Sequence, residues 1–145
     1  MYFAEVLERS SCEKSQLKSW LKDKVVIPVK PGNGPGSRAL FDDTNLLCAC
    51  IALRLNAMHI TVAKYSGAFG DLHNAFRSFS SLEWHKLVVV MSPESVQVQK
   101  LPHGHKLTAT DIAVTIEVNE VLKMLKIEPS EDKQLPFYLG LALTV

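Results

Sequence analysis

The sequence lacks any long apolar segment and contains few cysteines. Its main apolar runs, Leu87–Met91 and residues 139–143, are far shorter than the ~20 residues with which an α-helix crosses a bilayer. Three cysteines are an odd number for a disulfide framework, so we expect reduced thiols. Charged, patterned sequence follows Met1 directly, which predicts that there is no secretory signal. These absences favour a cytoplasmic protein without a membrane contact.

Charge of one sign is scarce overall but concentrated in one segment. The 145 residues carry a net charge of +1, yet residues 14–38 hold six Lys or Arg side chains and one acidic side chain, Asp23. Such a local excess is typical of a surface that binds a polyanion. Composition alone favours the simpler alternative of a solvated helix face. With 47% hydrophobic residues, the chain is expected to fold around its own core without a disulfide or a metal.

Two short amphipathic helices are predicted at the start of the chain, over residues 1–9 and 12–24. Ser10 and Ser11 separate them and are expected to cap the second helix. The second helix has an apolar face made of Leu17, Trp20 and Leu21. A different face carries Lys14, Lys18 and Lys22, with Ser15 and Ser19 beside them. Two short helices joined by a tight turn, the second one basic, predict a helix-turn-helix.

A β-hairpin is expected after the basic helix. Residues 25–29 favour a strand, and residues 31–36 contain only Pro, Gly and Asn, which is typical of a turn. Residues 37–41 are predicted to return as the partner strand. This arrangement puts Lys30 and Arg38 on the two arms of the hairpin.

The rest of the chain shows helix patterns first and mixed patterns later. Asp42, Asp43 and Thr44 are expected in the cap and first turn of a third helix over residues 45–56, and a fourth helix is predicted over residues 62–79. Further on we predict strands over residues 87–91, 96–101 and 112–118, a turn at 103–105, a helix over 120–126 capped by Asn119, a loop over 129–133, and a last strand or docking segment over 137–145.

These elements predict an α+β protein with two parts. Residues 1–80 are expected to form a winged helix-turn-helix domain that binds DNA. Residues 85–145 are expected to form a small antiparallel α+β unit for dimerisation or for binding a protein partner.

The element order and two short motifs resemble the MerR-type winged helix-turn-helix family. The motif Gln16-Leu17-Lys18-Ser19-Trp20 stands where that family has the core of its recognition helix, and residues 36–42 stand where its basic wing returns. The resemblance covers roughly residues 2–76. It implies a sequence-specific transcriptional regulator whose recognition helix enters the major groove and whose wing contacts the DNA backbone. The long dimerisation helix typical of the family is not apparent, so the mode of dimerisation stays open.

The side chains expected to contact double-stranded DNA are basic or short and polar. Gln16 is a candidate for a base edge, whereas Lys18 and Arg38 are candidates for phosphates. Lys64 and Arg77, on the fourth predicted helix, are weaker candidates for flanking DNA. The expected interface consists of Lys14, Ser15, Gln16, Lys18, Ser19, Lys22, Lys30 and Arg38. A homodimer is expected because one such domain covers only one half-site.

Catalytic and metal-binding patterns are poor in this sequence. His103-Gly104-His105 has no Cys or acidic residue at a suitable spacing and is expected to be a surface turn. Cys48 and Cys50 would point about 200° apart on a helix, which favours burial over a shared metal ion. No nucleophile–base pair is apparent. We therefore expect no enzyme activity, no cofactor and no metal.

Two other functions fit the same observations. A non-regulatory DNA adaptor, such as an excisionase-like or terminase-small-subunit-like module, would share the winged fold. A protein-interaction module would instead use the basic face to dock an acidic partner.

Overall fold

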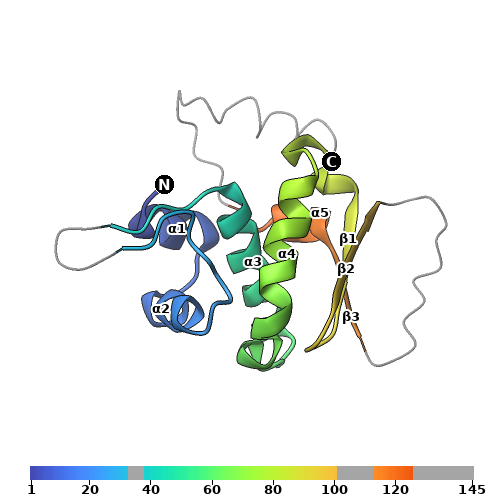
Figure 1. The fold of residues 1–145 in the computed structure, drawn as a ribbon, viewed down its shortest axis with the longest axis horizontal. Helices are drawn as coiled ribbons and strands as arrows, with labels where there is room; N and C mark the ends of the chain where they lie inside the picture. The colour runs from blue at the N-terminus through green and yellow to red at the C-terminus, as the bar shows by residue number, and fades with distance from the viewer. Residues whose placement is uncertain (33–37, 101–112, 126–145) are drawn as a thin grey trace.

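The structure, a computed structural model, describes residues 1–32, 38–100 and 113–125 (Figure 1). Helices and one small antiparallel sheet make up these residues, which confirms the predicted α+β class. The helical elements are α1 (Phe3–Ser10), α2 (Lys14–Lys22), α3 (Asp43–Ala57), η1 (Val62–Tyr65), α4 (Ser66–Ser78), η2 (Ser81–Lys86) and α5 (Val118–Leu122). The strands are β1 (Leu87–Met91), β2 (Val96–Lys100) and β3 (Val114–Glu117).

The cap of α2 differs from the sequence prediction. Its N-cap is Glu13, whose main-chain N–H donates to the Oε1 atom of Gln16 at 2.8 Å. This is the capping-box bond in which the side chain at the third helical position accepts from the N-cap. Ser10 is instead the last residue of α1, and its hydroxyl donates to the carbonyl of Val6 at 2.6 Å. Ser10 therefore ends the first helix instead of starting the second, while Ser11 takes the left-handed position after α1.

The predicted strand over residues 25–29 is wrong, because this segment caps the end of α2. Lys24 has a left-handed backbone with φ of 60°, and its N–H donates to the carbonyl of Leu21 at 3.4 Å. The next N–H, from Val25, donates to the carbonyl of Trp20 at 2.8 Å. These two bonds make a Schellman motif, in which an apolar residue after the turn packs back on the last helical turn. Val25 is fully buried, so its β-branched side chain serves the cap and the core instead of a ladder.

Helix α3 lies at the centre of the core. It packs against α1 on one side and against α4 and α5 on others (Figure 1). Because neighbours surround it, Cys48 and Cys50 are both buried although they point in different directions, as the sequence predicted. One continuous set of buried apolar side chains links α1, α3, α4, β1 and α5.

The segment expected to be one helix over residues 62–79 is two elements. The 3₁₀ turn η1 precedes α4, which starts at Ser66 and ends at Ser78. The following 3₁₀ helix η2, which the sequence analysis missed, brings Trp84 onto α4. The Trp84 indole donates to the carbonyl of Phe76 at 3.2 Å, and the two rings lie 5.9 Å apart. This contact fixes the entry of the chain into the sheet.

The sheet has the strand order β2-β1-β3, with both pairings antiparallel. All of β1 is buried, as its unbroken apolar sequence predicted. Val89 pairs with Val98 and Ile116 on the face that packs against the helices. On the other face the cross-strand partners of Val88 and Val90 are polar, namely Gln97, Gln99, Thr115 and Glu117. The sheet therefore turns one apolar face to the core.

Helix α5 begins two residues earlier than the sequence analysis predicted, and β3 ends one residue earlier. Strand β3 ends at Glu117, which is the N-cap of α5, and Asn119 lies inside that helix instead of capping it. Several predictions fall outside the described residues: the turn over 33–36, Ser37, Leu101, the turn at 103–105, Ile112, Lys126, the loop over 129–133 and the segment over 137–145. No helix within the described residues combines the length and the apolar content that a membrane span requires.

Candidate nucleic-acid interface

The elements that carry the predicted interface gather at one end of the molecule. Figure 1 shows α1, α2 and the arms of the hairpin at this end and the three-stranded sheet at the opposite end. We call residues 27–32 the outgoing arm and residues 38–41 the returning arm of the hairpin, and the two together the hairpin arms. Helix α3 and helix α4 separate the two ends (Figure 1). The basic segment is therefore remote from the sheet.

Helix α2 presents its lysines to solvent and its apolar side chains to the core. Leu17 and Trp20 are buried, as expected. The exposed positions of the helix are Lys14, Ser15, Lys18, Ser19 and Lys22. The long lysine side chains on this face can reach phosphates, and the short serine side chains leave room for the helix to approach DNA closely.

Gln16 has a role that the sequence analysis missed. Its Oε1 atom accepts the Glu13 N–H in the cap of α2, and its side chain is half-buried. Gln16 also lies beside a groove of about 550 Å³ between α2 and the end of α3. The walls of this groove include Ser15, Gln16, Ser19, Asp23, Asn56 and His59. Gln16 therefore lies on the side of α2 that borders this groove, and it caps the start of the helix.

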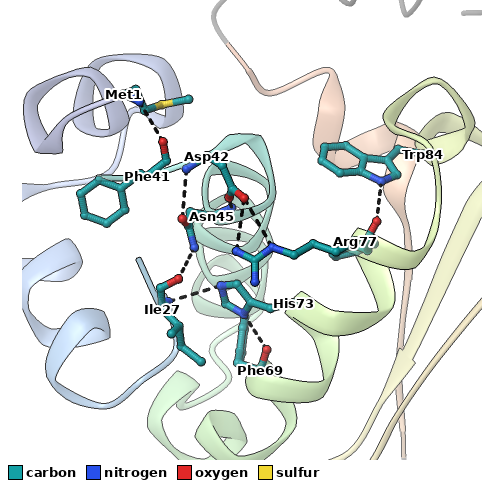
Figure 2. A network of polar contacts seen from close by, with 10 residues as sticks. Met1, Ile27, Phe41, Asp42, Asn45, Phe69, His73, Arg77 and Trp84 are labelled. Carbon is teal, nitrogen blue, oxygen red and sulfur yellow. Dashed lines mark hydrogen bonds and ion pairs between the residues drawn. The ribbon is translucent and has the colours of Figure 1, made fainter. Parts of the chain in front are cut away.

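The hairpin arms pair through one bridge within the described residues, not through two full strands. Lys30 and Leu40 exchange both main-chain hydrogen bonds, at 3.2 Å and 2.8 Å. The next residue, Phe41, exchanges two more with Met1, both at 2.8 Å (Figure 2). The returning arm therefore lies between the outgoing arm and Met1, which precedes α1.

The two basic side chains of the hairpin share its outer face. Phe41 is buried, Leu40 and Arg38 are exposed, and Ala39 is half-buried, so the returning arm alternates in and out. Lys30, the bridge partner of Leu40, projects to the same side as Leu40. Lys30 and Arg38 therefore lie on one solvent-facing surface.

Arg38 has an aromatic neighbour that the sequence analysis did not single out. Its guanidinium carbon lies 5.6 Å from the centre of the Tyr2 ring. Tyr2 is the N-cap residue of α1, and it is 46% exposed. A cation–π contact restricts the guanidinium without neutralising its charge, so Arg38 keeps its capacity to bind an anion.

The outgoing arm is held at Ile27 by two buried side chains, as Figure 2 shows. The Nδ2 group of Asn45, in α3, donates to the Ile27 carbonyl at 2.5 Å. The Ile27 N–H donates to Nε2 of His73, in α4, at 3.3 Å. We call this arrangement the Ile27 clamp. It attaches the hairpin to two core helices through the main chain of one residue.

The geometry determines the protonation state of His73. Its Nε2 accepts the Ile27 N–H, so the ring proton is on Nδ1 and is donated to the Phe69 carbonyl at 2.6 Å (Figure 2). Burial of the ring lowers the pKa of His73 below its ordinary value, and the nearby Arg77 lowers this pKa further. His73 is therefore a neutral residue in the folded chain.

Asn45 of the clamp is linked through Asp42 to a surface ion pair. Asp42 and Asn45 form the capping box of α3, with bonds of 2.9 Å and 3.1 Å between main-chain N–H groups and side-chain oxygens. Arg77 reaches the other carboxylate oxygen of Asp42 at 3.3 Å. Arg77, considered above for flanking DNA, is therefore paired within the fold, whereas Lys64 is exposed on η1.

Sequence signals for these residues differ in strength. Asn45 follows Asp42 by three residues, which is the spacing of a capping box and could have identified its cap role. Its second bond, to Ile27, leaves no local pattern because it spans eighteen residues. His73 gives no signal at all, since an isolated histidine in a helix has many possible environments.

Within the part of the chain that the structure describes, the remaining titratable groups do not assemble a metal site. Across residues 1–32, 38–100 and 113–125, no group of three His, Cys, Asp or Glu side chains is close enough to hold a metal ion. Burial raises the pKa of the Cys50 thiol to about 12 and that of Cys48 well above its ordinary value, so both are unreactive thiols.

A comparison with protein-family models finds no match for this chain, and a comparison with curated proteins finds no significant similarity.

Proposed function

We propose that this protein is a sequence-specific regulator of transcription that binds double-stranded DNA in the manner of the MerR-type winged helix-turn-helix family. The observation that carries the proposal is that two basic elements lie at the same end of the molecule. They are α2, with its exposed lysines, and the hairpin, with Lys30 and Arg38 on its outer face. In this proposal α2 enters the major groove and the hairpin is the wing.

The charge arrangement supports binding to a regular polyanion. Lys14, Lys18 and Lys22 recur every four residues, so they form a stripe along α2. Phosphates along a DNA strand are also regularly spaced, and a second contact from the wing would fix the helix in its groove. Ser15 and Ser19 lie next to the stripe and can donate to phosphates or base edges.

We further propose that the protein works in the cytoplasm as a homodimer. A single helix-turn-helix covers one half-site, and a two-fold pair would match a palindromic site. The sheet end, remote from the basic end, is the part proposed for dimerisation or for a protein partner.

The decisive experiment measures binding to duplex DNA as a function of salt. If five basic side chains contact phosphates, the slope of log K against log salt should be about −4 to −5. Lys18→Glu should abolish binding without changing the circular dichroism spectrum, because its side chain points away from the core. Lys86→Glu, the same charge change on η2, is the matched control and should retain binding.

Other results would point to the alternatives. If the wild-type protein shows no salt-dependent affinity for duplex DNA, the proposal is wrong, and the basic face is either a solvated helix face or a docking surface for an acidic protein. If footprinting shows protection of a recombination or packaging site instead of a promoter element, the protein is a DNA adaptor.

A further inference from the structure

We propose that Asn45 and His73 are positioning residues for the wing, and that protonation of His73 loosens the wing and weakens DNA binding. This inference rests on the proposed function for its effect on DNA. Its structural part, the Ile27 clamp, can be tested without DNA.

The clamp is well placed to set the direction of the outgoing arm. Ile27 lies three residues before Lys30, and both of its main-chain polar groups are held by side chains from the core helices. The Ile27 side chain itself is 36% exposed, so apolar burial holds this residue only partly. Asn45 and His73 are at most 1% exposed, which makes them fixed points on α3 and α4. The main-chain grip therefore aligns the arm that carries Lys30.

Protonation of His73 would break one half of this grip. The neutral ring donates through Nδ1 to Phe69 and accepts through Nε2 from Ile27. A second proton would bind at Nε2 and point at the Ile27 N–H, so two donors would face each other. The bond to Ile27 would be lost, whereas the bond to Phe69 would remain. The result is a loosened arm, not collapse of α4.

The charged groups around His73 act in opposite directions. Arg77, on the same helix, disfavours a second positive charge, whereas Asp42, at the cap of α3, favours it. Burial is the largest influence and lowers the pKa of His73. The clamp is therefore closed at neutral pH and opens only at a pH below the ordinary pKa of histidine. Asn45 does not titrate and keeps its hold on the Ile27 carbonyl, so the opening is partial.

Loss of alignment should be visible in DNA affinity. A charge-assisted contact from the wing that is no longer held in place is expected to weaken binding about tenfold. Loss of wing contacts should also reduce the salt dependence, because fewer phosphates are neutralised.

The first experiment measures affinity for one duplex between pH 7.5 and 5.5 at constant ionic strength, with the full chain. Wild-type affinity should fall about tenfold as His73 protonates. His73→Gln keeps an acceptor for Ile27 but does not titrate, so its affinity should stay nearly constant. His59→Asn is the control, because His59 is exposed and its left-handed backbone suits Asn; it should follow the wild-type profile. An identical pH profile for His73→Gln and wild type would overturn the inference.

The second experiment uses the wild-type protein alone and needs no variant to fold. Nuclear magnetic resonance gives the titration of the His73 ring and the exchange protection of the Ile27 amide, relative to an unstructured peptide at each pH. Protection of Ile27 should fall as His73 titrates, while that of the Val25 amide, held by Trp20, should not. If Ile27 keeps its protection, the clamp does not open. If protection falls as expected but no duplex is bound, the clamp stands and the proposed function is wrong.

Discussion

The two ends of this molecule are held together by different interactions. At the sheet end every residue of β1 is buried, and the strand is paired on both sides. At the basic end the described residues of the two hairpin arms share one bridge, and side chains support the arms: Asn45 and His73 at Ile27, and Tyr2 at Arg38. Apolar burial depends little on direction or pH, whereas a hydrogen bond depends on direction and, where the partner is His73, on protonation. The basic end should therefore be adjustable without loss of the fold, and the sheet end should not.

The largest expected effect tests the apolar support of the sheet end. Phe76→Ala removes a fully buried ring that packs on Trp84, and should lower the free energy of unfolding by about 3–5 kcal/mol. Urea denaturation followed by circular dichroism measures this change. Leu82→Ala is the control, because Leu82 is 58% exposed and its loss should cost less than about 0.5 kcal/mol. Equal effects from the two substitutions would contradict an apolar core at this end.

A smaller loss is expected at the clamp. Asn45→Ala removes a capping-box acceptor and leaves the Ile27 carbonyl without its partner, which should cost about 2–3 kcal/mol in the free energy of unfolding. The loss is measured by the same urea titration. Asn74→Ala, at an exposed position of α4, should change little. A cost for Asn45→Ala as small as that for Asn74→Ala would show that polar contacts do not hold the basic end.

The pH dependence of stability should separate the two ends. In the unfolded chain His73 titrates near 6.5, whereas in the folded chain its pKa is lower. Between these two values the unfolded state binds more protons, so the free energy of unfolding should fall as pH drops below 6.5. At the sheet end, Lys100 hydrogen-bonds to the Glu83 carboxylate and lowers its pKa, so any loss there begins only below about 4.5.

Urea titrations at several pH values check this order. His73→Gln should remove the part of the pH dependence that begins near pH 6.5, and Glu83→Gln should leave that part unchanged. If both variants retain the wild-type profile in this range, another group is responsible.

The wing contact should depend on salt concentration. Arg38→Ala is expected to reduce the salt slope of DNA binding by about one unit and to weaken all duplexes alike. Tyr2→Leu removes the ring below the guanidinium and should weaken binding about two- to fivefold, a cation–π contact of up to about 1 kcal/mol. Tyr2→Phe keeps a ring and should resemble the wild type in the same titrations. Equal losses for Leu and Phe would show that the ring has no part in binding.

The sequence predicts local features of this fold well. Leu17 and Trp20 are buried, Asp42 caps α3, and β1 is a buried strand, because each follows from apolar spacing, a capping residue or an unbroken apolar run. The prediction fails at residues 25–29, where the β-branched run indicated a strand. Val25 and Val26 instead follow the Schellman turn, since burial in the core outweighs their preference for a strand.

The candidate site is only partly predictable for a related reason. The exposed lysines of α2 follow from helical spacing, so their placement on one face could be foreseen. The contacts that hold the hairpin join Ile27 to Asn45 and His73, which are distant in sequence. Such contacts depend on how helices pack, and no local pattern records them. Gln16 shows a third case, because a polar side chain expected to contact a base also caps its own helix.

The smallest expected effect concerns the turn that ends α2, where the basic end tolerates backbone strain. Lys24 occupies the left-handed position of the Schellman motif, which glycine adopts without a steric cost. Lys24→Gly should therefore raise the free energy of unfolding by about 0.5–1 kcal/mol, because relief of the left-handed strain exceeds the added entropy of the unfolded chain. Lys24→Ala keeps the strain and should show no gain. His59 occupies the same position after α3, since its N–H bonds to the Asn56 carbonyl and the Ile60 N–H to that of Leu55. His59→Gly should thus give a similar gain by urea denaturation, and a loss in both glycine variants would mean that the lysine and histidine side chains stabilise these turns more than the backbone strains them.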